Sequence, residues 1–164
     1  MERIVAIDPG TTRSGVVVID ELTYRPLRIG KFENKDVVDE IEDLLPASKA
    51  VIEMVPSYGT GMAAGKDIYE TCIWIGRFIE QLSCCCDIVQ LLQRNVVKMH
   101  LCGSPRAKDP NVTQALVDRF APGETNYGKG TKKTPGFFYG FSADIWQAYA
   151  LAVTYLDMKK EGKI

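Results

Sequence analysis

The sequence contains few of the residues that most often bind transition metals. Its 164 residues include one histidine and five cysteines, and no two cysteines form a C-x-x-C pair. His100 has no cysteine or histidine at ligand spacing, and the consecutive residues Cys84, Cys85 and Cys86 cannot all reach one ion. These absences argue against a zinc site. An odd number of cysteines, without the spacing of a disulfide framework, indicates a reducing compartment.

Long apolar runs and a strong excess of one charge are also lacking. No apolar run reaches the roughly 18 residues of a membrane span, and the N-terminus has no signal-peptide profile. We therefore expect a cytoplasmic protein with no membrane partner. The net charge is -1, so any binding of phosphates must depend on local basic patches or on bound metal.

The chain length and a hydrophobic content of 46% predict a single domain spanning residues 1–164. Strand-like and helix-like patterns alternate after three initial strands, which predicts an α/β fold with a central five-stranded mixed sheet flanked by helices on both faces. Asp109 is expected to cap a helix that has Pro110 at its first position. The expected strands are 3–8, 15–20, 25–32, 50–55 and 88–92; the expected helices are 37–45, 67–83, 95–101, one from 109, and 142–160; residues 122–139 are expected to form a flexible loop.

Two acidic residues each follow directly on a short apolar strand. Asp8 follows residues 4–7, and Glu53 follows Val51 and Ile52. Ligands bind at the carboxyl ends of strands in α/β sheets, so we interpret this pair as metal-binding carboxylates in preference to solvated strand ends. A third acid, Asp144, begins the last expected helix, where an acid also suits the helix dipole. The small apolar residues after Asp144 predict a helix packed closely on the sheet, which would bring Asp144 toward the two strand ends.

Four motifs in order resemble those of RuvC-like Holliday junction resolvases. They are Ile7-Asp8-Pro9-Gly10 with Gly15, then Ile52-Glu53, then the basic segment 103–108 followed by Val112, and finally Asp144-x-x-Gln147-Ala148-x-Ala150-Leu151-Ala152. Each motif alone is weak, but the ordered set spans nearly the whole chain. The resemblance implies the ribonuclease-H-like fold and a structure-specific endonuclease that resolves four-way DNA junctions in a bacterial or phage-infected cell.

The resemblance also implies a catalytic site of Asp8, Glu53 and Asp144 that holds Mg²⁺ or Mn²⁺. Two such ions about 4 Å apart would activate water and stabilise both oxygens of an in-line displacement, and hard cations prefer oxygen ligands. This chain departs from the family because Gln147 stands where a fourth carboxylate is usual. Gln147 should share the helix face of Asp144 and offer an uncharged amide oxygen. Asp109 and Glu124 are the acids that could replace the missing fourth carboxylate, although a role as helix cap explains Asp109 better.

Several cationic and aromatic residues are expected to contact DNA. Lys108 is our candidate for contact with the scissile phosphate, and Tyr58, in the loop after Glu53, for stacking on an unpaired base. The long helix over 67–83 carries an apolar stripe of Ile68, Cys72, Ile75, Ile79 and Leu82, with further aromatics elsewhere. This surplus predicts a contact in a homodimer, which would place two sites on one junction. The candidate DNA-binding residues are Tyr58, Arg94, Lys98, Arg106, Lys108, Lys129, Lys132 and Lys133, with His100 in the same basic stretch.

Three other interpretations stay open. Residues 6–15 also resemble the phosphate loop of sugar kinases of the actin–hexokinase superfamily, although those enzymes close two domains over ATP, and we expect no nucleotide cofactor here. A non-catalytic protein that binds branched DNA fits the presence of Gln147. A single-domain RNA nuclease would use the same site.

Overall fold

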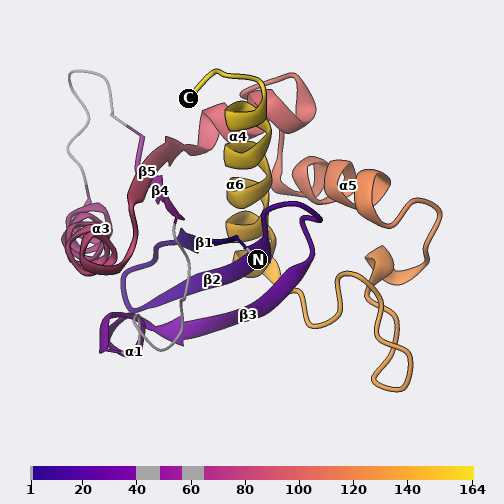
Figure 1. The fold of residues 1–164 in the computed structure, drawn as a ribbon, viewed down its shortest axis with the longest axis horizontal. Coiled ribbons are helices and arrows are strands. Elements are labelled where there is room, and N and C mark those ends of the chain that lie inside the picture. Colours follow the sequence, from indigo (N-terminus) through magenta and orange to yellow (C-terminus); the bar gives the residue numbers. More distant parts are fainter. Residues whose placement is uncertain (1, 40–48, 57–64) are drawn as a thin grey trace.

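The computed structural model describes residues 2–39, 49–56 and 65–164, and its centre is a five-stranded sheet (Figure 1). The strand order is β3-β2-β1-β4-β5. β1 pairs antiparallel with β2 and parallel with β4; β2 pairs antiparallel with β3, and β4 parallel with β5. The strands are β1 (Arg3–Asp8), β2 (Arg13–Asp20), β3 (Pro26–Glu33), β4 (Lys49–Met54) and β5 (Ile88–Gln93). The predicted mixed sheet is confirmed.

The helices follow the predicted order, with ends that shift by a few residues. The helix expected over 37–45 is described only as far as Asp39, because residues 40–48 lie outside the described residues. The helices are α1 (Asn34–Asp39), α3 (Lys66–Cys85), α4 (Arg94–Cys102), α5 (Asp109–Phe120), the short 3-10 helix η1 (Asn126–Gly128) and α6 (Ala143–Lys160).

Alternation along the strands divides the interior into two cores, one on each face of the sheet. In β1, Ile4 and Ala6 join the core beneath α6, whereas Val5 and Ile7 join the core beneath α3. Successive strand side chains point to opposite faces, so helices cover both faces, as predicted. α4, α5 and α6 lie on one face, with α1 and α3 on the other (Figure 1).

The last helix, α6, is buried on every side over most of its length. All residues from Ile145 to Leu156 are buried, and α6 packs across β1 and β2. Ala148, Ala150 and Ala152 carry small side chains that allow its backbone to approach the sheet. The close packing predicted for this helix is confirmed. No helix within the described ranges is long and apolar enough to cross a membrane.

One local prediction is wrong. The cap of α5 is Lys108, not Asp109, and the amide of Lys108 donates to Asn111 Oδ1 at 2.9 Å.

The segment 122–139 is largely a loop, as predicted, and contains the short η1 and a bridge between Gly130 and Pro135. Its end is fixed by aromatic contacts that the sequence did not reveal. They form among Phe120, Phe137, Phe138, Phe141, Trp146 and Tyr149.

The buried face of α3 matches the predicted apolar stripe only in part. Ile75 and Leu82 are buried as expected, but Thr71 and Phe78 complete the face. Ile68, Cys72 and Ile79 are only half-buried. The face of this helix is therefore rotated from the one predicted.

Candidate active site

The strand register places Asp8 and Glu53 side by side. β1 and β4 run parallel with Ile7 opposite Ile52, so the next residue of each strand is Asp8 and Glu53. Ala6 and Val51, two residues earlier, point into the core beneath α6. By the same alternation, both acids point to the α6 side of the sheet. The pairing expected from the sequence is therefore present.

Asp144 reaches the same region because α6 begins close to β2. A Cβ atom on Gly15 would lie 2.5 Å from the carbonyl oxygen of Asp144. Real Cβ atoms do not approach an oxygen so closely, so only glycine allows this contact between β2 and the start of α6. The carboxylate of Asp144 forms an ion pair with Lys31, which stands opposite Gly15 in the sheet.

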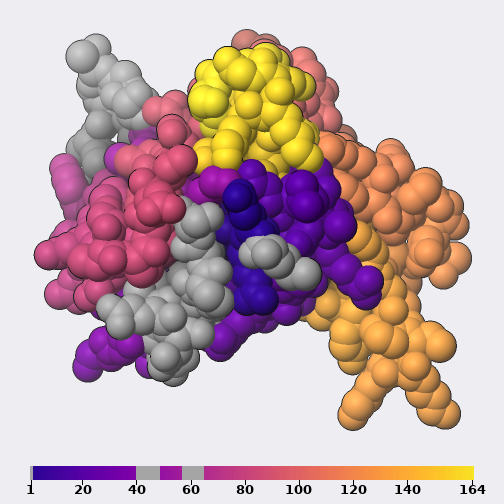
Figure 2. Space-filling model, viewed as in Figure 1, coloured from indigo at the N-terminus to yellow at the C-terminus, as the bar shows by residue number. Residues whose placement is uncertain are grey.

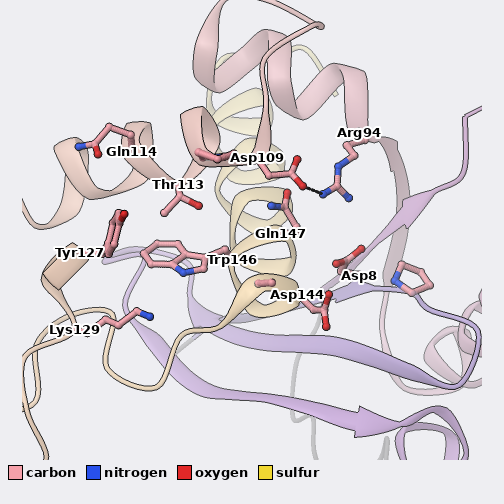
Figure 3. A pocket seen from close by; sticks show the side chains of 13 residues that line it. Asp8, Arg94, Asp109, Thr113, Gln114, Tyr127, Lys129, Asp144, Trp146 and Gln147 are labelled. Carbon is pink, nitrogen blue, oxygen red and sulfur yellow. Dashed lines mark hydrogen bonds and ion pairs between the residues drawn. The ribbon is translucent and has the colours of Figure 1, made fainter.

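A pocket of about 620 Å³ opens where these elements meet, and we call it the acidic pocket (Figure 3). Asp8, Asp109 and Asp144 gather at one end of it, with Arg94 and Gln147 beside them. Tyr127 and Lys129 lie at the other end, across the face of Trp146. The pocket is thus acidic at one end and carries a cation and aromatic rings at the other. Its lining residues are Asp8, Pro9, Arg94, Asp109, Pro110, Thr113, Gln114, Tyr127, Lys129, Ala143, Asp144, Trp146 and Gln147.

Arg94 links two of the acids instead of facing solvent. Its Nη1 lies 3.1 Å from Glu53 Oε1, and its Nη2 lies 3.1 Å from Asp109 Oδ2. Lys98 Nζ adds a longer contact of 3.5 Å to Asp109. Both cations were expected to contact DNA phosphates, but in this structure their nearest anions are carboxylates of the protein.

Burial and mutual repulsion make the acids reluctant to ionise. Burial, and next the charge of Glu53, raise the pKa of Asp8 from 3.8 to about 8, although Arg94 opposes the rise. Burial likewise raises the pKa of Glu53 against the opposing effect of Arg94. Several carboxylates that share a desolvated site have this effect on each other unless a cation lies between them. Asp8 and Glu53 therefore keep their protons to a higher pH than free carboxyl groups do.

The donor set suits a hard cation, although the carboxylates do not surround a common point. The oxygens of Asp8, Glu53, Asp144 and Gln147 are the type that Mg²⁺ and Mn²⁺ prefer. Gln147 is 8% exposed and lines the acidic pocket, so its amide faces the acids as the helical spacing predicts. Among the described residues, no three histidine, cysteine or acidic side chains are arranged to hold a metal ion. Lys31 and Arg94 hold Asp144 and Glu53 in ion pairs, so these carboxylates would have to turn toward an incoming ion.

The other cations predicted to bind DNA fall into two separate groups. Arg106 and Lys108 are exposed near the start of α5, and Lys108 does not line the acidic pocket. Lys129 lines that pocket, whereas Lys132 and Lys133 are exposed on the turn beyond it. The segment after α5 projects from the body of the molecule (Figure 2, orange). Tyr58 lies outside the described residues.

His100 does not belong to a DNA-facing group. Its Nε2 lies 2.8 Å from Asp157 Oδ2, and Asp157 also accepts hydrogen bonds from Arg119 and Tyr24. This cluster joins α4 and α5 to the far end of α6, away from Asp144. Burial by itself would raise the pKa of Asp157, but hydrogen bonds from Arg119, His100 and Tyr24 lower it to about 2. His100 therefore has a role in packing helices together.

Sequence reasoning missed two residues that the structure brings to the site and undervalued a third. Lys31 reaches Asp144 from β3, a strand that carried no candidate. Asp109, which was considered as a replacement acid but interpreted as a helix cap, faces the acidic pocket and Arg94. Trp146 lines the pocket from α6. The alternation of β3 opposite Gly15 would have pointed to Lys31, but only with the strand register known.

The chain has a ribonuclease-H-like fold. This fold is defined by the order of the strands and the helices on both faces, with acids at the ends of β1 and β4 and at the start of α6. By sequence, the chain matches no protein-family model and no curated protein. Its structure is similar to that of Thermus thermophilus RuvC, with a TM-score of 0.68, 17% sequence identity, and 98% of this chain and 96% of that chain covered. It is also similar to T. thermophilus RuvC in complex with a Holliday junction substrate, with a TM-score of 0.70, 16% identity, and 99% and 97% of the two chains covered. The chain therefore has a RuvC-like fold, as its motifs predicted.

Proposed function

We propose that the protein is an endonuclease that cuts four-way DNA junctions by hydrolysis dependent on Mg²⁺ or Mn²⁺. The observation that carries the proposal is that, in a RuvC-like fold, Asp8 and Glu53 end two paired strands and Asp144 lines the same pocket as Asp8. Their oxygens suit a hard cation, and their crowding gives such a cation a reason to bind. The similarity to RuvC bound to a Holliday junction substrate supports the choice of substrate.

Each residue of the site has a part in this proposal. Asp8 and Glu53 would hold the metal from the ends of two paired strands, and Asp144 would complete the site from α6. Bound Mg²⁺ would supply an activated water and stabilise the charge on the phosphate oxygens. Gln147 adds an amide oxygen without charge, so the site carries one negative charge fewer than a four-carboxylate set. Arg94 holds Glu53 in place and partly neutralises the acids before DNA arrives.

Cations around the acidic pocket would bind the junction arms. Lys129 lies on the pocket wall, and Lys132 and Lys133 extend the same basic segment outward. Arg106 and Lys108 offer a second basic group beside α5, although Lys108, our candidate for contact with the scissile phosphate, does not line the acidic pocket. Contacts of this kind give binding that weakens with salt and carries little sequence information. Tyr58 remains our candidate for stacking on a base at the crossover.

A homodimer would place two such sites on one junction. The support is an apolar surface on the outer side of α3, where Tyr69 is 62% exposed and Ile73, one turn later, is 60% exposed. Residues four apart on a helix share a face, so the ring of Tyr69 and the side chain of Ile73 are both available to one partner. Ile73→Lys should shift the protein toward monomer in sedimentation velocity. Ile73→Lys should also convert paired nicks into single ones. Asp118→Lys, a change of charge at an exposed position of α5 on the opposite face of the sheet, should do neither.

Cleavage of labelled synthetic substrates tests the choice of substrate. A four-way junction, a linear duplex, a single strand and an RNA–DNA duplex would be incubated with Mg²⁺ and with Mn²⁺. The proposal expects symmetric nicks in the junction and at least tenfold slower cutting of the other substrates. Preferential cutting of an RNA strand would replace it with the RNA-nuclease alternative.

The second candidate is a protein that binds branched DNA without cutting it. Gln147 in place of an acid, together with Lys31 and Arg94 paired to Asp144 and Glu53, favours this candidate. It predicts tight junction binding with no nicks in either metal. In that case Gln147→Asp, which restores a charged ligand, should be tested for recovered cleavage.

A further inference from the structure

A second depression of about 350 Å³ adjoins the acidic pocket, and nothing in the proposed mechanism uses it. It is lined by the turn 9–13 together with Asp8, Lys31 and Asp144, and we call it the turn pocket. Asp8, Pro9 and Asp144 line both pockets. A strand lying in the acidic pocket could therefore continue past these acids into the turn pocket.

The turn that forms this pocket is held by buried hydrogen bonds. Asn34, which is 1% exposed, donates from Nδ2 to the carbonyl of Gly10 at 2.8 Å and accepts a 2.6 Å hydrogen bond from the hydroxyl of Ser14. Its backbone amide donates to the carbonyl of Thr12 at 2.8 Å. A Cβ on Gly10 would lie 2.3 Å from the carbonyl oxygen of Arg13, so this tight turn needs glycine. The turn is thus fixed in shape before any ligand binds.

Two cations at the mouth of the turn pocket keep N–H groups available for an anion. Arg13 pairs through Nε with Glu33 at 3.1 Å and donates from Nη2 to the carbonyl of Lys31 at 2.8 Å. A guanidinium has five N–H groups, so three are not used by these contacts. The ammonium of Lys31 has three, and its pair with Asp144 uses one. Both side chains are more than 40% exposed, so solvent or a ligand reaches them.

We propose that the turn pocket binds a phosphate of the cleaved nucleic acid strand. This phosphate is the neighbour of the scissile phosphate. Arg13 and Lys31 contact its oxygens as cations, and the hydroxyls of Thr11 and Thr12, which line the pocket, donate further hydrogen bonds. Anchored in this way, the strand is aligned across Asp8 and Asp144. This inference rests on the proposed function, because it requires a nucleic acid in the acidic pocket.

The test measures binding of the full chain to a fluorescent four-way junction in EDTA, over a range of KCl concentrations. Lys31→Gln and Arg13→Gln are compared with wild type and with Lys163→Gln. Lys163 is a control of the same charge, exposed and ion-paired with Glu161 near the C-terminus. Loss of one phosphate contact lowers the slope of log affinity against log salt by about 0.9, which corresponds to roughly 8-fold weaker binding at 0.1 M salt. Each of the first two variants should show this change, the control should not, and all should keep the wild-type melting temperature within about 2 °C.

A scan with single methylphosphonates, which remove the charge of one phosphate, locates the contact. At one position next to the cleavage site, neutralisation should weaken wild type but not Lys31→Gln, because the variant has already lost that contact. The proposal is wrong if wild type prefers the junction and both variants keep its affinity and salt slope. If the variants weaken but wild type binds duplex as tightly as the junction, the subsite stands and the choice of substrate fails. If wild type binds no nucleic acid, both fall.

Discussion

At the candidate active site β2 meets the first turn of α6 at Gly15, and this contact leads to a sharp prediction for Gly15→Ala. The new Cβ would lie 2.5 Å from the carbonyl oxygen and 2.8 Å from the carbonyl carbon of Asp144. Ordinary contact needs about 3.4 Å, so β2 and α6 must separate by almost 1 Å. Overpacking of this kind costs about 1–3 kcal/mol, and for a chain of this size that lowers the melting temperature by roughly 2–12 °C.

The same shift moves Asp144 away from Asp8 and Glu53. Since a misplacement of about 1 Å at a reacting centre can cost about 100-fold in rate, cleavage should fall far more than stability. Melting by circular dichroism and junction cleavage at 25 °C, where the variant stays folded, measure the two effects separately.

Gly76→Ala is the matched control for this experiment. Gly76 lies on the exposed side of α3, and a Cβ there meets nothing within 4 Å. Alanine at a helical position should raise stability by about 0.5–1 kcal/mol and leave cleavage unchanged. Wild-type stability and wild-type cleavage in Gly15→Ala would refute the argument that glycine sets the distance between β2 and α6.

Three further predictions concern the acids and the turn. The pKa of Asp8 is raised to about 8, so its buried carboxyl stabilises the fold when it is protonated. This contribution to the free energy of unfolding is complete below about pH 4 and is lost as the pH rises through 8. In EDTA, Asp8→Asn should therefore match wild type in melting temperature at pH 4 and exceed it increasingly up to pH 8, by on the order of 4 kcal/mol at pH 7; a difference that stays constant with pH would count against it. Arg94→Gln removes the cation between Glu53 and Asp109, and should cost about 1–3 kcal/mol in urea unfolding at pH 7 in EDTA; unchanged stability would mean that the two ion pairs are solvated. Asn34→Ala leaves the carbonyl of Gly10 and a buried hydroxyl without this partner, and should cost about 1–3 kcal/mol in the same assay, whereas a loss below about 0.5 kcal/mol would show that the turn holds without Asn34.

The fold and the main acids could be predicted because their signals are local. Apolar runs ending in Asp8 and Glu53 predict strand ends, and the small residues of α6 predict close packing on the sheet. A mixed sheet flanked by helices then follows from general rules of α/β folds, whereas the ribonuclease-H-like fold was implied by the resemblance of the motifs. The identity of the three candidate acids needed no knowledge of distant contacts.

The parts that could not be predicted depend on contacts between distant segments. Lys31 reaches Asp144 only because β3 pairs with β2 in one register. Arg94 was grouped with DNA-binding cations because its neighbours in sequence are basic, but its neighbours in space are Glu53 and Asp109. A charge pattern along the chain cannot tell a cation that neutralises a buried acid from one that waits for phosphate.

The most direct test of the central claim is nicking of a labelled four-way junction with Mg²⁺, Mn²⁺ or EDTA, by wild type, Asp8→Asn and Glu53→Gln. The account predicts nicks with either metal, none in EDTA, and at least a 100-fold loss in both variants, while junction binding is kept. Cleavage that persists in EDTA or survives both substitutions would contradict it, because hydrolysis would then not depend on the carboxylates at the ends of β1 and β4.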